Sequence, residues 1–255
     1  MGERTRYTLG TFCFADLGTD DRDAAASFYG GLFGWNAEAS QGAYTMFTLE
    51  GNPVAGMFQA PAGYPNSWLS YVSVEDADAV TAEARELGAS VPLEPRAVSD
   101  EAEIGRSALL KDPQGALVAL WEPGLHVGAG LVNEVGTMVW NQLATRDVEA
   151  AMGFYAELLG WTTEPVDDGQ GGYWNWRNRD GWLNAGVTAL PDEDAPPHWQ
   201  VWFTVEDAAG GVARAQELGG TELVPAAPTP LGGDVAVLRD PTGAAFVLFA
   251  GDIDP

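Results

Sequence analysis

The chain has 255 residues and a formal net charge of −25, with 37 acidic residues against 12 lysines and arginines. Binding to a phosphate backbone needs clustered basic residues, so this composition argues against a nucleic-acid partner. The chain has no apolar window of membrane-spanning length and no apolar stretch in residues 1–7, and it has a single cysteine, Cys13; we expect no membrane partner, no secretory signal, no internal disulfide and a cytoplasmic location.

The first half of the chain alternates between short strands and two helices. A strand is expected at 10–17, followed by a helix at 21–33 with apolar residues at helical spacing and Gly34 as its stop. The remaining expected elements are strands at 44–49, 54–59 and 68–74, a helix at 75–87, and strands at 91–98, 104–110 and 116–121. The order strand, helix, strands therefore occurs twice within this half.

The second half repeats the first. Phe28–Trp35 returns as Phe154–Trp161 after 126 residues, Val74–Ala77 as Val205–Ala208 after 131, and Lys111–Ala116 as Arg239–Ala244 after 128. A repeat that keeps its order while its offset drifts slightly indicates a duplicated domain with loop insertions. We expect one domain at 1–124, a linker at 125–132 and a second domain at 133–255.

The repeated motifs are Phe-Tyr-x-x-Leu-(Phe/Leu)-Gly-Trp, Val-Glu-Asp-Ala before a helix that ends Glu-Leu-Gly, and (Lys/Arg)-Asp-Pro-x-Gly-Ala. Because these motifs occur in the same order in both halves, the chain resembles the vicinal oxygen chelate superfamily, which includes glyoxalase I, extradiol dioxygenases and bleomycin-resistance proteins. More narrowly, the chain is similar to actinobacterial two-domain proteins labelled hydroxylases or glyoxalase-like antigens, labels that rest largely on fold analogy.

This resemblance implies an α+β fold made of two glyoxalase-like domains in tandem. Each domain is then built of two βαβββ units that form a curved, mostly antiparallel sheet around a cleft, with the helices outside. Some members of the superfamily build the cleft by pairing subunits. Two covalently joined copies can provide that pairing within one chain, so both a monomer and a homodimer remain open.

Metal-using members of the superfamily hold a divalent ion with His, Glu or Gln from three strands of the cleft. The corresponding positions here are Phe14, Leu69 and Ala119 in the first domain, and Trp140, Gln200 and Val247 in the second. A Zn, Fe or Ni site needs at least three N, O or S donors. His198 adds only a second donor beside Gln200, and His126 falls in the linker. We therefore expect no metal and no cofactor.

Aromatic and amide side chains take the place of metal ligands. Strand alternation predicts that Phe12 and Asp16 share a face with Phe14, and that Met138 and Gln142 share one with Trp140. By the same rule Tyr71 joins Leu69, and Trp202 joins Gln200. The candidate ligand-binding residues are Phe14, Asp16, Tyr71, Trp140, Gln142, Trp174, Trp176, Arg177, His198, Gln200 and Trp202. No catalytic residue is assigned.

Each candidate also has a plainer interpretation. A single tryptophan usually fills a core, whereas aromatic side chains that share a face with polar groups are typical of a small-molecule pocket. Asp16 and Gln142 are also consistent with simple hydrogen bonds to a neighbouring loop. Arg177 is also consistent with an ordinary pair to a surface carboxylate, and His198 with the start of a strand.

Three functions compete on this evidence. The first is a metal-free small-molecule-binding protein, similar to the bleomycin-resistance branch, with its aromatic cleft best formed in the C-terminal domain. Its ligand would be cationic or planar, because acidity attracts cations and aromatic rings bind both kinds of group. The second is a glyoxalase-type lyase or a hydroxylase or dioxygenase-like enzyme. The third is a protein-interaction module with degenerate clefts.

Overall fold

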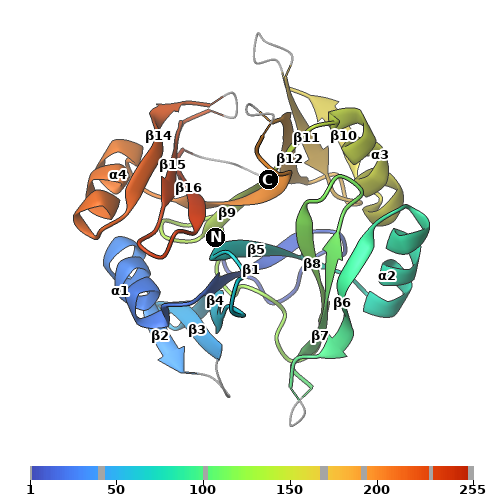
Figure 1. Ribbon diagram of the computed structural model, residues 1–255, viewed down its shortest axis with the longest axis horizontal. Helices are drawn as coiled ribbons and strands as arrows, with labels where there is room; N and C mark the ends of the chain where they lie inside the picture. The colour runs from blue at the N-terminus through green and yellow to red at the C-terminus, as the bar shows by residue number, and fades with distance from the viewer. Residues whose placement is uncertain are drawn as a thin grey trace.

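Two eight-stranded sheets, one from each half of the chain, form the computed structural model, which describes residues 2–39, 44–99, 103–166, 172–190, 194–229 and 232–251 (Figure 1). The first half contains β1 (Phe12–Thr19), α1 (Arg22–Phe33), β2 (Asn36–Ala39), β3 (Tyr44–Leu49), β4 (Asn52–Gln59), β5 (Ser67–Ser73), α2 (Ala77–Glu86), β6 (Ser90–Ala97), β7 (Gly105–Lys111) and β8 (Leu117–Pro123). The second contains β9 (Met138–Thr145), α3 (Val148–Leu159), β10 (Thr162–Pro165), β11 (Tyr173–Arg177), β12 (Leu183–Ala189), β13 (His198–Thr204), α4 (Ala208–Glu217), β14 (Thr221–Pro228), β15 (Asp234–Arg239) and β16 (Ala245–Ala250).

In each sheet two βαβββ units lie side by side, as the sequence repeat predicts. The strand orders are β2-β3-β4-β1-β5-β8-β7-β6 and β10-β11-β12-β9-β13-β16-β15-β14. The units join through the antiparallel pairs β1–β5 and β9–β13, and each unit contains one parallel pair, such as β1–β4. The residue pattern does not predict β2, because all four of its residues are exposed and no apolar alternation marks it.

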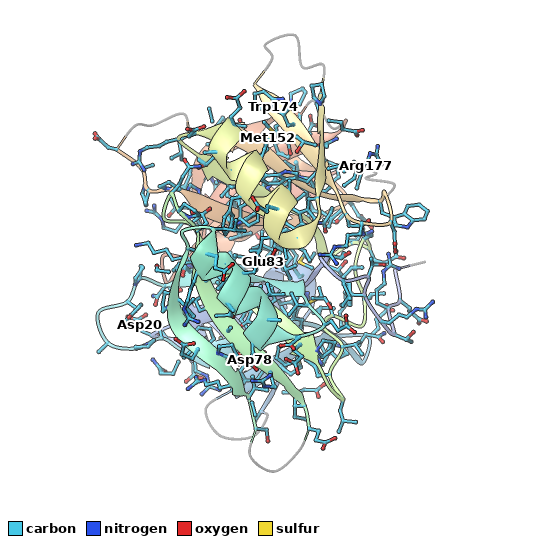
Figure 2. The ribbon with its side chains drawn as sticks, turned by 90° about the vertical axis from the view of Figure 1, so that its right-hand side faces the viewer. Asp20, Asp78, Glu83, Met152, Trp174 and Arg177 are labelled. Carbon is cyan, nitrogen blue, oxygen red and sulfur yellow. The ribbon has the colours of Figure 1, made fainter. Side chains whose placement is uncertain are left out.

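The four helices of the described segments lie on the outside of the sheets, and each begins with an aspartate side chain that accepts a hydrogen bond from a backbone N–H in the first turn. These caps are Asp21, Asp76, Asp147 and Asp207. Figure 2 shows α3 above α2 on one flank of the molecule, with the acidic Asp78 and Glu83 on α2. No helix in the described part of the chain is long and apolar enough to cross a membrane.

The repeated motifs lock the two halves together. The hydroxyl of Tyr29 donates to Oδ2 of Asp240 over 2.9 Å and accepts from Nε1 of Trp68. The same contact recurs with the halves exchanged, where the Tyr155 hydroxyl donates to Oδ2 of Asp112 over 3.1 Å. Since α1 packs beside α4 and α2 beside α3 (Figure 1), the two larger apolar cores each contain residues from both halves.

The motif tryptophans bind across the same junction. Nε1 of Trp35 donates to the backbone oxygen of Gly136 over 2.7 Å, and Nε1 of Trp161 donates to that of Gly10 over 2.6 Å. Both glycines have a φ of 80°, a left-handed conformation that glycine adopts without strain. The residues that reveal the duplication in the sequence therefore have a structural role.

Two strand irregularities correct the predicted faces. The register of β1 against β5 shifts between Phe12 and Phe14, and that of β9 against β13 shifts between Met138 and Trp140. A bulge interrupts alternation. Phe12 and Met138 therefore leave the concave faces predicted for them and enter the cores shared between the halves.

Candidate functional site

A cavity of about 370 Å³ opens on the concave face of the first sheet. Its lining includes four aromatic side chains, one carboxylate and one imidazole. They are Phe14, Tyr44, Tyr71, Trp121, Asp16 and His126. A concave, mostly apolar wall with a few converging polar groups is the usual form of a small-molecule site.

The register of three neighbouring strands builds this face. Phe14 of β1 lies opposite Tyr71 of β5, which in turn lies beside Ala119 of β8. In the next row Asp16 lies between Leu69 of β5 and Gly56 of β4. Phe14, Asp16 and Tyr71, three of the residues proposed from the sequence, line the same cavity.

The carboxylate of Asp16 lies at the base of the cavity. It is 6% exposed, and its two oxygens accept separate hydrogen bonds from the hydroxyls of Tyr44, over 2.6 Å, and Tyr71, over 2.9 Å. Burial raises the pKa of Asp16 to about 6, although both hydroxyl donors act to lower it. Burial and the neighbouring Asp16 also raise the pKa of both tyrosines, so their hydroxyls stay protonated and continue to donate.

His126 reaches this cavity from the segment that follows β8. Its backbone N–H donates to the oxygen of Ile104, and its own backbone oxygen accepts from Nε1 of Trp121 over 2.9 Å. The ring meets Phe14 edge-on with centroids 5.0 Å apart. Nε2 is buried and has no hydrogen-bond partner among the described residues, and burial lowers the pKa of the imidazole.

The sequence interpretation placed His126 in the linker and missed its position in the cleft. The available signal was that one of only two histidines follows the last strand of the first half by a few residues. Tyr44 was missed for a different reason. It comes from β3, a strand to which the resemblance assigns no ligand position.

The concave face of the second sheet is packed with side chains. Trp140, Trp202, Val247 and Phe249 form one cluster in which no member is more than 4% exposed. Nε1 of Trp140 donates to the hydroxyl of Tyr173 over 3.0 Å, while Nε1 of Trp202 is buried without a partner in the described structure. These side chains pack against one another and leave little exposed surface, so they form a small core.

Gln142 takes the place of Asp16 in this second half. Like Asp16 beside Gly56, it lies beside a glycine, Gly186, in the parallel strand pair. Its amide contacts that of Gln200 over 3.3 Å. The second face therefore has paired neutral amides where the first has a carboxylate.

The other proposed site residues lie apart from the first cavity. Trp176 is fully buried against Tyr155 and Trp161, and Trp174 packs on the same core. Nε and Nη2 of Arg177 donate to the two oxygens of Glu164 over 2.9 and 2.8 Å, and Nδ1 of His198 lies 2.9 Å from the backbone oxygen of Pro196. Figure 2 shows Trp174 and Arg177 on the upper part of the molecule.

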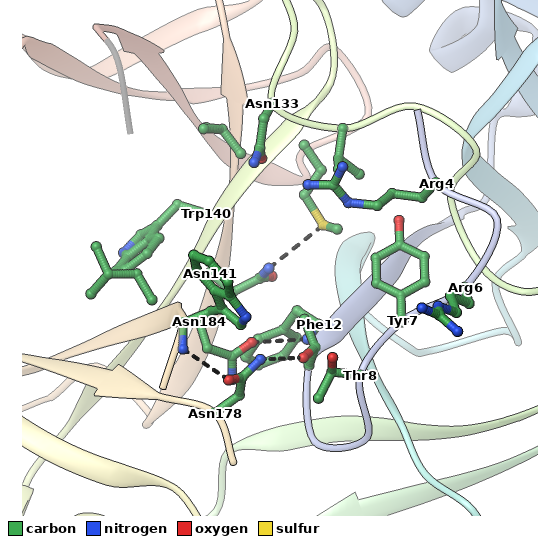
Figure 3. Close-up of a pocket in the computed structure, with 16 residues that line it drawn as sticks. Arg4, Arg6, Tyr7, Thr8, Phe12, Asn133, Trp140, Asn141, Asn178 and Asn184 are labelled. Carbon is green, nitrogen blue, oxygen red and sulfur yellow. Dashed lines mark hydrogen bonds between the residues drawn. The ribbon is translucent and has the colours of Figure 1, made fainter. Parts of the chain in front are cut away.

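A second cavity of about 350 Å³ lies where the N-terminal segment meets the second half (Figure 3). Trp140 is part of its lining, and several of its polar side chains form hydrogen bonds between the two halves. The amide of Asn184 donates to Gly10 and accepts from the Phe12 N–H, and Nδ2 of Asn178 donates to the Thr11 hydroxyl over 2.9 Å. These bonds identify the second cavity as part of the junction between the halves.

The first cleft does not fit a superfamily-type metal ion. The three carried-over positions, Phe14, Leu69 and Ala119, lie on neighbouring strands but present a ring, an isobutyl group and a methyl group. In the part of the chain that the structure describes, no three His, Cys, Asp or Glu side chains gather as a metal site would require. Among the described residues, Asp16 is the one carboxylate that lines this cavity, and its oxygens accept hydrogen bonds from tyrosines.

Comparison with known proteins places these features in context. A family model described as a glyoxalase-like domain matches twice, at residues 12–121 and 139–249. CFP32 of Mycobacterium tuberculosis, provisionally named a glyoxylase, is 36% identical over 96% of this chain and 97% of its own. DauV of Streptomyces sp. (strain C5), named an anthracycline biosynthesis protein, is 36% identical over 95% of this chain and 94% of its own.

Solved structures share the fold at low sequence identity. The Mn(II)-bound glyoxalase from Novosphingobium aromaticivorans has a TM-score of 0.67 and 15% identity, over 100% of this chain and 85% of its own. An extradiol ring-cleaving dioxygenase from B. fuscum has a TM-score of 0.68 and 18% identity, over 97% of this chain and 74% of its own. Likeness at this identity establishes the tandem architecture and leaves the chemistry to the site itself.

Proposed function

The chain belongs to the glyoxalase-like family, and we propose that within this family it serves as a metal-free protein that binds a planar aromatic small molecule in the cleft of its first half. The observation that carries the proposal is the cavity of about 370 Å³ with aromatic walls around one buried carboxylate. Phe14, Tyr71 and Trp121 offer ring surfaces to a flat ligand, and Asp16 offers a fixed acceptor for its polar group.

The ligand class is consistent with one group of relatives. Proteins named for anthracycline biosynthesis match this chain over nearly its whole length, and anthracyclines are flat fused-ring compounds. We extend only the shape of such a molecule to this chain. The two halves share their cores within one chain, so a monomer in the cytoplasm suffices for this function.

The proposed site is in the first half, whereas the sequence favoured the second. The second concave face holds a packed cluster of Trp140, Trp202 and Phe249, and room for a ligand there would require these side chains to move. The first cavity needs no such rearrangement. One ligand per chain is therefore the expected stoichiometry.

A second candidate function is a metal-free enzyme of the lyase type. The observation that favours it is the presence of Asp16 and His126 in one cavity, since a carboxylate with a pKa of about 6 and a neutral imidazole are both suited to proton transfer near neutral pH. Turnover of a bound compound that is lost in Asp16→Asn and in His126→Gln would support this function. A bound compound recovered unchanged supports the binding function.

Titration of the protein with flat fused-ring compounds tests the main proposal. Intrinsic tryptophan emission should be quenched with saturation at one ligand per chain, and Trp121→Phe should weaken binding about tenfold through lost ring contact. The matched control is Trp202→Phe, which changes the same residue type in the second half and should leave the affinity unchanged. Absence of saturable binding across a broad panel would contradict the proposal.

A further inference from the structure

We infer that the ligand of the first cleft carries a protonated amine, and that the carboxylate of Asp16 is its counter-ion. The inference rests on the proposed binding function and adds the chemical class of the ligand. It depends on three features of the cleft: a buried carboxylate without an ion pair, the neutral groups around it, and the aromatic rings that line the cavity.

Among the described residues, Asp16 has hydrogen-bond donors but no positive partner. Its two donors, Tyr44 and Tyr71, are neutral hydroxyls. Within the described part of the chain, the arginine side chains that form ion pairs do so with other carboxylates, such as Glu122 and Glu164. A buried carboxylate without a cation is costly in free energy, and a charged partner of the right geometry offsets that cost. A ligand ammonium would supply the missing charge.

Among the described residues, the titratable groups that face Asp16 do not supply that positive charge. Burial raises the pKa values of the Tyr44 and Tyr71 hydroxyls and of the Cys13 thiol, so these groups are neutral near pH 7. Burial lowers the pKa of His126, which is then neutral as well. Arg96 of β6 acts on Tyr71 through its charge, but its side chain is exposed to water.

The walls of the cavity also suit a cation. Phe14 and Tyr71 have ring centroids 6.3 Å apart, and Tyr71 and Trp121 are separated by the same distance. Aromatic faces attract ammonium groups through their quadrupoles, and the attraction grows when water is excluded. The net charge of −25 draws cations toward the protein as a whole. A flat ring with an amine therefore matches both the walls and the base of the cavity.

The second half contains a natural comparison for this arrangement. Gln142 stands where Asp16 does and bonds to the neutral Gln200. The place of Tyr71 is taken by Trp202, whose Nε1 has no acceptor among the described residues. In the part of the chain that the structure describes, the counter-ion is thus confined to the first cleft, and one amine should bind per chain.

Three probes with the same ring test the inference. They are 1-naphthylmethylamine, which is a cation, 1-naphthylmethanol, which is neutral, and 1-naphthoic acid, which is an anion. Calorimetry at pH 7 should show the amine binding at least about tenfold more tightly than the alcohol, as expected for one charge-assisted hydrogen bond. The Asp16→Asn variant should bind the amine only as tightly as it binds the alcohol. The Gln142→Glu variant should keep the wild-type affinity for the amine in the first cleft.

The pattern of failure distinguishes this inference from the function on which it rests. If amine and alcohol bind equally and Asp16→Asn affects neither, the cleft binds aromatic rings and the inference of an amine is wrong. If the acid binds best and Arg96→Gln abolishes the preference, the ligand is an anion and the inference is again overturned. If no probe binds the wild type, the proposed function fails together with the inference.

A pH series provides a test that does not require a substitution at Asp16. The amine stays protonated across the range in which the carboxylate titrates. Its affinity should therefore fall by about tenfold as the pH is lowered from about 7 to about 5, whereas the affinity of the alcohol should stay level. Parallel behaviour of the two probes would overturn the inference even if Asp16→Asn failed to fold.

Discussion

Gly56 leaves open the space through which the hydroxyl of Tyr44 reaches Asp16. A Cβ atom at position 56 would lie 1.8 Å from that hydroxyl and 2.1 Å from Oδ1 of Asp16. The backbone of Gly56 has an ordinary conformation, so the requirement for glycine is steric. The second half repeats the arrangement, since a Cβ at Gly186 would lie 1.9 Å from the hydroxyl of Tyr173.

We expect Gly56→Ala to displace Tyr44 from Asp16. Overpacking of this kind typically costs about 1–3 kcal/mol of the free energy of unfolding, which denaturant titration measures. The variant should also bind the aromatic ligand more weakly. The matched control is Gly153→Ala on the exposed side of α3, where no atom lies within 4 Å of the added carbon and a gain of about 0.5–1 kcal/mol is expected. Equal effects of the two changes would refute the steric account.

Asp16 should make stability depend on pH in a direction opposite to that of a salt-bridged aspartate. Its pKa is raised from 3.8 to about 6 in the folded protein, so the folded state holds the proton more tightly than the unfolded state. Its contribution to stability is therefore greatest below the unfolded value and is lost as the pH rises through about 6, by up to about 3 kcal/mol. The free energy of unfolding of the Asp16→Asn variant should not show this loss as the pH rises. The difference between the pH profiles of the wild type and the variant therefore isolates the contribution of Asp16. Parallel profiles would contradict the burial of an unpaired carboxylate.

The duplicated tyrosines should contribute to stability at the junction of the halves. Tyr29→Phe leaves Oδ2 of Asp240 and Nε1 of Trp68 without their shared hydroxyl, and an unsatisfied buried polar group costs about 1–3 kcal/mol. Tyr155→Phe should have a similar effect on the other core. The control Tyr64→Phe, at a position that is 69% exposed, should change the free energy of unfolding by less than about 0.5 kcal/mol. A cost no larger than that of the control would show that the junction does not depend on these bonds.

Trp140 and Trp202 should contribute to the free energy of unfolding and have no effect on the affinity for the ligand. Both are at least nine-tenths buried in the packed cluster of the second half. The double change to Phe should lower the free energy of unfolding by about 2–4 kcal/mol through lost packing. Calorimetry with the aromatic ligand should give an unchanged affinity. A large loss of affinity with little loss of stability would show that the ligand binds in the second half.

The repeats made the fold predictable from the sequence. Motifs that recur in the same order determine two copies of one topology, and equivalent residues such as Asp16 and Gln142 do occupy equivalent places in the two sheets. The resemblance also supplied the metal-ligand positions, and Phe14, Leu69 and Ala119 do lie on neighbouring strands of the first sheet.

What the sequence could not show depends on contacts between distant residues. The bulge that turns Phe12 toward the core arises in the pairing of β1 with β5 and has no local residue pattern. Tyr44 enters the cleft from β3 because Gly56 leaves room for its hydroxyl. His126 is held there by the hydrogen bond from its backbone N–H to the backbone oxygen of Ile104. Side-chain packing also decided that the aromatic residues of the second half form a small core while those of the first line a cavity.

A crystal structure of the protein with 1-naphthylmethylamine tests the central claim most directly. The account predicts one probe per chain, with its ring against Phe14 and Trp121 and its nitrogen within hydrogen-bond distance of Asp16. A probe bound on the concave face of the second half, or an ion held by three protein donors in either cleft, would contradict it.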